Sequence, residues 1–275
     1  MDKRYGESLD HWHQKPKKKE LSKSEVLFEE AKRLNSEKRY SDALTLVNVA
    51  IESDETNFKY YTCKGIILEN LGRYSEAEKA YDEALELNDS DDVYENKARM
   101  LYKWANSLND KTKALNLIDE AIQILPISKT DEYFERFWYL KGSIYDCLAQ
   151  PIESRRCYLI AEGMTDELKA LDEDINFLKN STDTLINITG TQFYFGHEPF
   201  AKGIPLTLIA EPENEHDSDA IRVEIEGETV GYVANNDHTL VDNVKSATQI
   251  KAMNPKKAEV VLIYLGQYVI AKLIK

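Results

Sequence analysis

Hydrophobic and small residues in the first part of the chain recur at the spacing of paired helices. Within one repeat length they occupy helical positions at Tyr61, Gly65, Leu68, Tyr74, Ala77, Tyr81 and Ala84. Thirty-four residues earlier, Tyr40, Ala43 and Ala50 repeat the second half of this pattern. A period of about 34 residues is typical of stacked two-helix repeats, in which small residues let helices approach and aromatic rings fill the gaps. The pattern therefore predicts a helical array.

The same pattern predicts four repeats over residues 24–163. The third repeat carries small and apolar residues in its second helix, at Ala114, Ile118 and Ala121. The fourth repeat is marked by aromatic and small residues at Trp138, Gly142, Tyr145, Tyr158 and Ala161. Arg99 stands where the small residue of the third repeat is expected, so this repeat departs from the pattern without ending the array.

Helical spacing gives way to strand patterns after the array. Residues 164–182 are expected to form a capping helix and a linker, and residues 183–275 a separate domain. In that domain short apolar or alternating runs predict about five or six antiparallel strands, with a helix over 237–247. Such a set favours a small, partly open β-barrel. The expected fold class is α+β in two domains, an all-α array followed by a small barrel.

Charge limits the kinds of partner. The 275 residues carry a net charge of −14, which divides into +3 for residues 1–23, −12 for 24–182 and −5 for 183–275. Such a chain repels a polyanion, so contact with nucleic acid is expected only locally, at an end or a base. No apolar run is long enough to span a membrane, and residues 1–23 lack the apolar stretch of a signal peptide. We therefore expect a cytoplasmic protein with a basic, flexible N-terminal segment over 1–23 and no membrane partner.

The helical repeats resemble the tetratricopeptide family. The resemblance implies a right-handed superhelix whose concave face, built from the first helix of each repeat, binds a protein or an extended peptide of unknown identity. Alignment with the family places a chemically mixed set on this face, Lys59, Thr62, Ile66, Lys97, Met100, Trp104, Arg136 and Tyr139. The alternative is that the array serves only as a spacer or a dimer surface.

Three segments of the second domain form another recognisable set. Gly190 to Gly196 contains an aromatic triplet, Glu211 to Ile221 is a polar turn, and Val230-Gly231-Tyr232 follows. In this order they resemble the HIRAN domain. The resemblance implies an OB-like barrel that captures the 3′ end of single-stranded DNA, a role best known beside fork-remodelling helicases.

The resemblance also implies roles for individual residues. The candidate DNA-binding residues are Gln192, Phe193, Tyr194, Asn214, His216, Asp217, Tyr232 and Asn235. Phe193 and Tyr232 would stack on bases, which needs no sequence readout. Asp217 would accept a hydrogen bond from the 3′-hydroxyl, which an internal, esterified oxygen cannot donate. Alternatively, Asp217 is only a turn residue whose carboxylate caps its own backbone.

Several of these positions depart from the helicase-linked relatives. Gln192 replaces an Arg, Glu213 replaces a neutral amide, and Asn235 lies near where a Lys approaches the phosphate. Each change removes positive charge or adds negative charge along the implied phosphate path. We therefore expect lower affinity for DNA and a flatter dependence on salt.

Catalytic chemistry has little support in the sequence. Walker, GxGxxG, HExxH and GxSxG motifs are all missing, so we expect neither enzyme activity nor a cofactor. His11 and His13 have no further ligand nearby, which favours a flexible tail over a metal site.

Two hypotheses for the function remain. One is a non-catalytic adaptor that binds a single-stranded DNA 3′ end and recruits a DNA-repair or replication partner through its repeats. The other is a protein-interaction adaptor whose barrel has lost DNA binding.

Overall fold

The computed structural model describes residues 21–236, 241, 243–265 and 268–274, and the side chains of 129–132 are not described. The basic segment expected over 1–23 lies almost wholly outside the described residues, as do His11 and His13. The chain divides into two compact units, residues 1–137 and 138–275, which we call the N-terminal and C-terminal units. The domain boundary expected after residue 182 stays a prediction.

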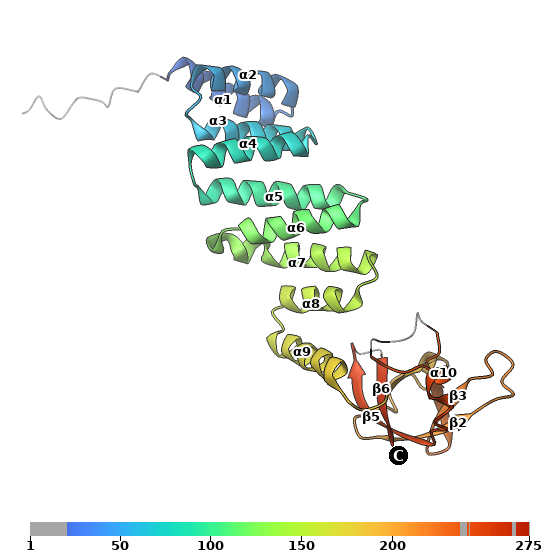
Figure 1. Ribbon diagram of the computed structural model, residues 1–275. Helices are drawn as coiled ribbons and strands as arrows, with labels where there is room; N and C mark the ends of the chain where they lie inside the picture. Colours follow the sequence, from blue (N-terminus) through green and yellow to red (C-terminus); the bar gives the residue numbers. More distant parts are fainter. Residues whose placement is uncertain (1–20, 237–240, 242, 266–267, 275) are drawn as a thin grey trace, which may run out of the picture. The chain divides into compact units, whose positions relative to one another are not determined.

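Helices follow one another from Lys23 to Asn180. Their bounds are α1 (Lys23–Ser36), α2 (Tyr40–Ser53), α3 (Phe58–Asn70), α4 (Tyr74–Leu87), α5 (Asp91–Ser107), α6 (Lys111–Ile124), η1 (Ile127–Lys129), α7 (Thr130–Cys147), α8 (Pro151–Ala161) and α9 (Thr165–Asn180). Helices α1 to α6 lie side by side in sequence order (Figure 1). Within the described residues, no helix is both long and apolar enough to cross a bilayer. The expected helical array is confirmed.

Small residues are needed where the two helices of a pair touch. A Cβ atom added at Gly65 of α3 would lie 2.8 Å from the ring of Tyr81 in α4, which is fully buried. A Cβ at Gly142 of α7 would lie 2.7 Å from the ring of Tyr158 in α8. Distances this short are below van der Waals contact, so each glycine lets the tyrosine ring of the following helix pack against its backbone.

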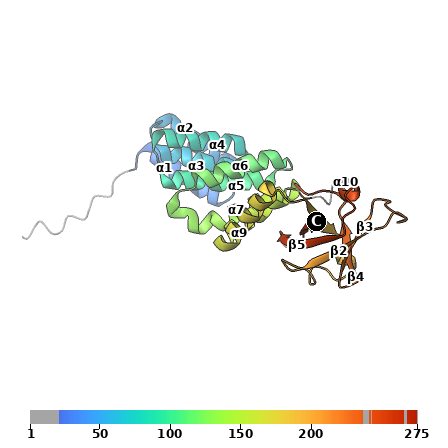
Figure 2. The same ribbon diagram turned by 60° about the horizontal axis from the view of Figure 1, so that its bottom comes forward.

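The barrel strands are β1 (Leu185–Thr189), β2 (Pro205–Ala210), β3 (Ile221–Ile225), β4 (Glu228–Val233), β5 (Lys257–Tyr264) and β6 (Tyr268–Ile274). A short 3-10 helix, η2 (Thr191–Phe193), follows β1, and α10 (Ala247–Lys251) lies beside the barrel in Figures 1 and 2. The strand order is β1-β4-β3-β2-β5-β6, and every strand pair is antiparallel. Alternating burial along β2, with Leu206 and Leu208 inside, matches the two-residue period of a strand.

The barrel differs from the expected one in being closed. Strand β1 pairs with β4 through Ile188 and Val233, and with β6 through Leu185 and Lys272, so both of its edges are used. The prediction of a partly open barrel was wrong, because the pairing of the first strand with the last, β1 with β6, is not visible in local sequence patterns. The α+β class, with a helical array followed by a small barrel, is confirmed.

Two further expectations concern segments around the barrel. The helix expected over 237–247 is wrong for the described residues, where Asn243 has a φ of 65° and helix α10 begins only at Ala247. Residues 237–240 and 242 lie outside the described residues. Helix α9, expected to cap the array, shares one apolar cluster with α8 and the barrel, in which Leu171 and Leu178 pack with Leu185.

Candidate nucleic-acid site and helical groove

A cavity of about 460 Å³ opens where β1 and β4 meet the polar turn that precedes β3. Most of the expected DNA-binding residues line it, namely Tyr194, Asn214, His216, Asp217, Tyr232 and Asn235. They come from separate parts of the sequence, and antiparallel pairing brings these parts together. Tyr232 lies opposite Thr189 in the register of β1 with β4. The sequence resemblance thus selected residues that share one cavity.

Gln192 and Phe193 do not line this cavity. Both lie in η2 and are exposed, and 80% of the surface of Phe193 is accessible. Tyr194, next in the chain, faces Tyr232 instead, with ring centroids 6.5 Å apart at 42°. The ring opposite Tyr232 is therefore Tyr194 rather than Phe193, which remains a predicted stacking surface outside the cavity.

The approach of β4 to β1 depends on Gly231. A Cβ atom at this position would lie 2.7 Å from the carbonyl oxygen of Thr189. No side chain fits there unless the two strands move apart. Gly231 therefore allows β4 to approach β1 closely at the residue next to Tyr232.

A carboxylate network holds the Tyr232 ring in place. The Tyr232 hydroxyl donates to Glu211 Oε2 at 3.2 Å, and Asn214 Nδ2 donates to the same oxygen at 3.0 Å. Arg222 Nε lies 3.2 Å from Glu211 Oε1. Burial, followed by the Glu211 charge, raises the pKa of Tyr232 to about 12, so its hydroxyl stays a donor at neutral pH. Sequence reasoning missed Glu211 and Arg222, which do not line the cavity.

Asn214 shapes the turn that carries Asp217. Its Oδ1 accepts from the backbone N–H groups of His216 and Asp217 at 3.0 and 3.2 Å. Because its Nδ2 donates to Glu211, both ends of the amide already have protein partners. Asn214 therefore fixes the backbone at the rim of the cavity, and its expected contact with a nucleotide stays a prediction.

The Asp217 carboxylate has one protein donor on each oxygen. Oδ1 accepts from the backbone N–H of Asp219 at 2.8 Å, and Oδ2 accepts from Asn235 Nδ2 at 2.8 Å. The Asp217 carboxylate thus caps its own turn, as in the alternative hypothesis, but these two hydrogen bonds do not use all of its acceptor capacity. A carboxylate oxygen has two lone pairs, so each oxygen keeps one for a ligand donor.

Positive charge is scarce at this cavity. Among its described lining residues none is Lys or Arg, and Asp217 is the only Asp or Glu. Lys251 of α10 lies nearby but is paired with Asp219 at 2.5 Å, and this contact, followed by the Thr248 hydrogen bond, lowers the pKa of the Asp219 carboxyl. The cavity therefore suits a ligand group that is uncharged and donates hydrogen bonds.

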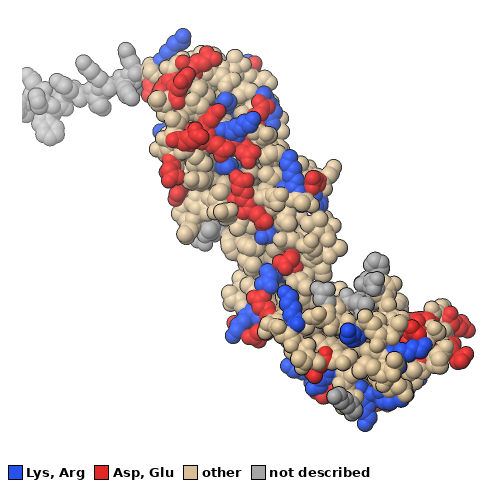
Figure 3. Space-filling model, in the orientation of Figure 1, with Lys and Arg blue, Asp and Glu red and all other residues tan. Residues whose placement is uncertain are grey.

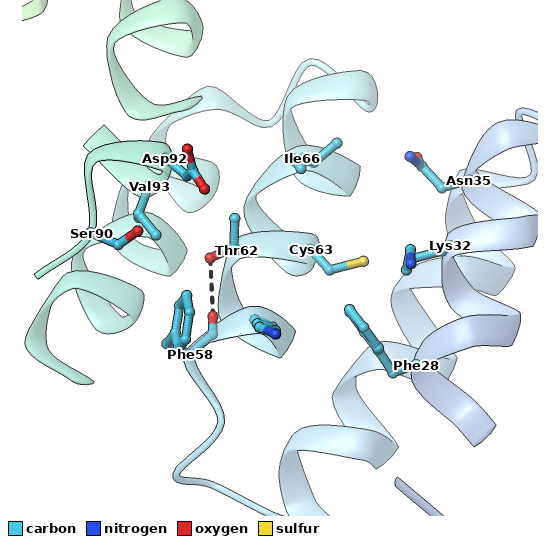
Figure 4. Close-up of a pocket in the computed structure, with 11 residues that line it drawn as sticks. Phe28, Lys32, Asn35, Phe58, Thr62, Cys63, Ile66, Ser90, Asp92 and Val93 are labelled. Carbon is cyan, nitrogen blue, oxygen red and sulfur yellow. Dashed lines mark hydrogen bonds between the residues drawn. The ribbon is translucent and has the colours of Figure 1, made fainter. Parts of the chain in front are cut away.

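A second cavity of about 460 Å³ lies in the N-terminal unit, between the first helices of successive pairs. Figure 4 shows Phe28 and Lys32 of α1 facing Cys63 and Ile66 of α3. Three of the expected groove residues, Lys59, Thr62 and Ile66, line it. Burial raises the pKa of the Cys63 thiol to about 11, so it is not a reactive thiolate at neutral pH.

The expected groove residues of α5 are wrong. Lys97 contacts Asp82 of α4 at 2.8 Å and Glu120 of α6 at 3.0 Å, and Met100 is fully buried. Trp104 stacks on Tyr74 of α4 at 6.0 Å. All three residues thus face the second helices or the core, away from the groove.

A one-residue shift in α5 explains this error. Near the position of α5 that corresponds to Gly65, the small, fully buried residue is Ala98, 33 residues after Gly65, and not Arg99 at 34. A one-residue shift turns a helix face by about 100°. The counterparts of Lys59, Thr62 and Ile66 are then Asp92, Glu95 and Arg99.

The contacts of these three residues agree with the shifted register. Asp92 lines the groove cavity. Glu95 accepts from the hydroxyl of Tyr133 in α7 at 3.3 Å, and the Arg99 guanidinium lies 6.0 Å from the same ring. In the sequence, the small residue Ala98 next to Arg99 was the signal that could have identified this register.

The last two expected groove residues lie on α7. Arg136 is exposed and belongs to the N-terminal unit, whereas Tyr139 belongs to the C-terminal unit. The Tyr139 hydroxyl donates to Glu162 at 3.0 Å, and its ring lies 5.6 Å from Tyr158. Neither residue lines the groove cavity, so their role in binding a peptide stays a prediction.

Comparison with known proteins gives family matches for both parts of the chain. The tetratricopeptide repeat model matches residues 58–91, and the HIRAN domain model matches residues 182–254. A curated relative, the "DnaJ protein P58IPK homolog" of Arabidopsis thaliana, is 31% identical over 107 residues. The match covers 36% of this chain and only 22% of the relative.

Solved helical proteins resemble part of the chain at low identity. The chaperone SycD of Yersinia enterocolitica, in complex with a peptide of the translocator YopD, is 16% identical with a TM-score of 0.35. That match covers 44% of this chain and 90% of SycD. MamA from Desulfovibrio magneticus RS-1 is 18% identical with a TM-score of 0.38, covering 57% of this chain and 93% of MamA. Likeness at this level carries no functional conclusion.

The two family matches agree with the two sites. The repeat model covers α3 and α4, which carry the groove residues Lys59, Thr62 and Ile66, and the HIRAN model covers the cavity with Asp217 and Tyr232. A HIRAN domain indicates a nucleic-acid partner, and a tetratricopeptide repeat indicates a protein partner. The chain therefore carries a tetratricopeptide repeat followed by a HIRAN domain.

Proposed function

We propose that the protein is a non-catalytic adaptor that binds the 3′ end of single-stranded DNA through its barrel. The observation that carries this proposal is the position of Asp217 in a cavity that Tyr194 and Tyr232 also line. The two rings offer faces for a terminal base, worth on the order of 1–3 kcal/mol per stacked base. The remaining lone pairs of Asp217 are suited to accept a free 3′-hydroxyl.

The scarcity of positive charge at the cavity favours recognition of a DNA end over contacts along the DNA phosphate backbone. With no Lys or Arg among the described lining residues, a phosphate in this cavity would meet only the Asp217 charge. A terminal sugar with a free hydroxyl avoids this repulsion. In the proposed role the groove between α1, α3 and α5 recruits a protein partner to the DNA end, for example one that acts in DNA repair.

Binding of matched oligonucleotides to the full-length protein tests this role. We expect a short strand with a 3′-hydroxyl to bind more tightly than the same strand with a 3′-phosphate in fluorescence anisotropy. Asp217→Ala should weaken binding of the hydroxyl strand about tenfold, because a hydrogen bond to a charged group is lost, and should strengthen binding of the phosphate strand, because the repelling charge is removed. Glu215→Ala, which removes a neighbouring exposed carboxylate, is the matched control and should retain selectivity.

A second function remains a candidate on one specific observation. Both oxygens of Asp217 already have protein donors, so the carboxylate also suits a barrel that has lost DNA binding and contacts only proteins. A wild-type protein that binds neither oligonucleotide would favour this alternative. Equal affinity for the two strands would contradict hydroxyl recognition.

A further inference from the structure

We propose that Asn235 is a positioning residue that orients the Asp217 carboxylate in the cavity, a role that rests on the DNA-end recognition proposed above. Asn235 Nδ2 donates to Asp217 Oδ2 at 2.8 Å, and Asn235 Oδ1 accepts from the backbone N–H of Thr248 at 3.0 Å. The side chain thus bridges the turn that carries Asp217 and the first turn of α10.

The Thr248 contact determines which way the Asn235 amide faces. A backbone N–H needs an acceptor, so the amide oxygen must point toward Thr248 and the NH₂ group toward Asp217. The opposite orientation would place two oxygens against each other at Asp217 and two donors against each other at Thr248. Asn235 is therefore a fixed donor for the carboxylate.

Two donors then hold the carboxylate at both ends. The Asp219 N–H holds Oδ1 and Asn235 holds Oδ2, which removes the rotation that Asp217 would otherwise have. Asp219 is itself held by the Thr248 hydroxyl at 2.6 Å and by Lys251. A group held in its binding geometry before the ligand arrives loses less entropy on binding.

A direct phosphate contact by Asn235 fits these contacts poorly. A phosphate oxygen on the second N–H of the Asn235 amide would approach the Asp217 carboxylate, whose Oδ2 is 2.8 Å from the same nitrogen. Like charges at that separation repel. Asn235 thus acts on the ligand through Asp217.

A double-mutant cycle in the full-length protein tests the proposal. Asn235→Ala should weaken binding of the 3′-hydroxyl strand about tenfold and leave the 3′-phosphate strand within twofold, so that selectivity falls. In the Asp217→Ala background the same change should add less than about twofold, because the group it positions is gone. Asn235→Asp retains an acceptor for Thr248 but faces Asp217 with an oxygen, and should lose selectivity at least as far.

The control and the opposing outcome are defined by the same measurements. Asn180→Ala removes an exposed amide of α9 and should bind both strands like the wild type. The proposal is overturned if Asn235→Ala weakens both strands equally and does so again without the Asp217 carboxylate, since that result describes direct contact with DNA.

Amide hydrogen exchange without DNA separates this proposal from the proposed function. Asn235→Ala should speed exchange in peptides that cover residues 216–220, and should do so less in the Asp217→Ala background. If this coupling is found but the wild type binds the 3′-hydroxyl and 3′-phosphate strands equally, the link between Asn235 and Asp217 stands and the DNA-end function fails. Unchanged exchange in Asn235→Ala would overturn the link itself.

Discussion

At the scale of single residues, the barrel site is a set of side chains that fix one another. Glu211 joins Tyr232, Asn214 and Arg222, so the ring beside the cavity and the turn at its rim are held by one carboxylate. Arg222 contacts both Glu211 and Glu224 at 3.2 Å, so it offsets part of the negative charge of this network. The aromatic wall and the turn that carries the acceptor are consequently linked through Glu211.

The raised pKa of Tyr232 predicts a loss of stability at high pH. Its folded pKa of about 12 exceeds the value of about 10 in an unfolded chain, so the unfolded state releases the phenolic proton first. This contribution to stability is fully present below pH 10 and is lost as pH rises toward 12. The midpoint of urea unfolding should therefore fall between pH 9 and 11.5, and should fall less in Tyr232→Phe. An equal fall in both proteins would contradict a contribution from Tyr232.

At the scale of elements, the helix pairs are matched by complementary size. Positions 16 residues apart combine Ala31 with Val47, Gly65 with Tyr81, Ala98 with Ala114 and Gly142 with Tyr158. A glycine in the first helix accompanies a tyrosine in the second, and an alanine accompanies a smaller partner. The pair, rather than either residue, is what each repeat preserves.

This pairing predicts non-additive effects on stability. Gly65→Ala should lower the free energy of unfolding by up to about 2 kcal/mol, because overpacking costs about 1–3 kcal/mol and the gain in helix propensity offsets about 1 kcal/mol. Tyr81→Val alone leaves space in the core and should also destabilise. The double variant recreates the Ala31–Val47 combination and should lose less than the sum of the two single losses. Chemical denaturation of all four proteins measures this, and strict additivity would refute the pairing.

At the scale of the whole molecule, acidic charge sets the conditions for binding DNA. Asp and Glu side chains are spread over the helical part of the face shown in Figure 3, in keeping with the net charge of −14. Long-range attraction of a polyanion is therefore absent, and recognition depends on contacts in the cavity. High affinity for long, continuous strands is not expected from such a surface.

The salt dependence of binding should accordingly be shallow. We expect log K for a short single strand to fall with log salt at a slope no steeper than about −0.7, equivalent to at most one phosphate contact. Gln192→Arg adds a cation beside the site and should steepen the slope by about 0.7. Glu228→Gln, at the far end of β4, changes the net charge by the same amount and should leave the slope unchanged. Anisotropy titrations between 50 and 200 mM salt decide this, and a steep wild-type slope would show a phosphate path outside the cavity.

Local chemistry determined much of this protein from the sequence alone. The 34-residue recurrence of Tyr, Ala and Gly predicted the helical array, because side chains on one helix must match the next at a constant spacing. Alternating apolar runs predicted strands for the same reason at a period of two. The polar turn with Asp217, together with Tyr232, predicted a candidate site through its resemblance to the HIRAN domain, and these residues line one cavity.

Only the tertiary structure decided features that depend on contacts between distant residues. Three such features join segments that are far apart in sequence. Strand β1 closes the barrel, Tyr194 faces Tyr232, and the Asn235 amide donates to Asp217. The face of α5 was misassigned because a one-residue shift is small in the sequence but turns the helix by about 100°. The period of the sequence determines which helices and strands form, whereas packing decides which face of a helix is buried and which strands and side chains pair.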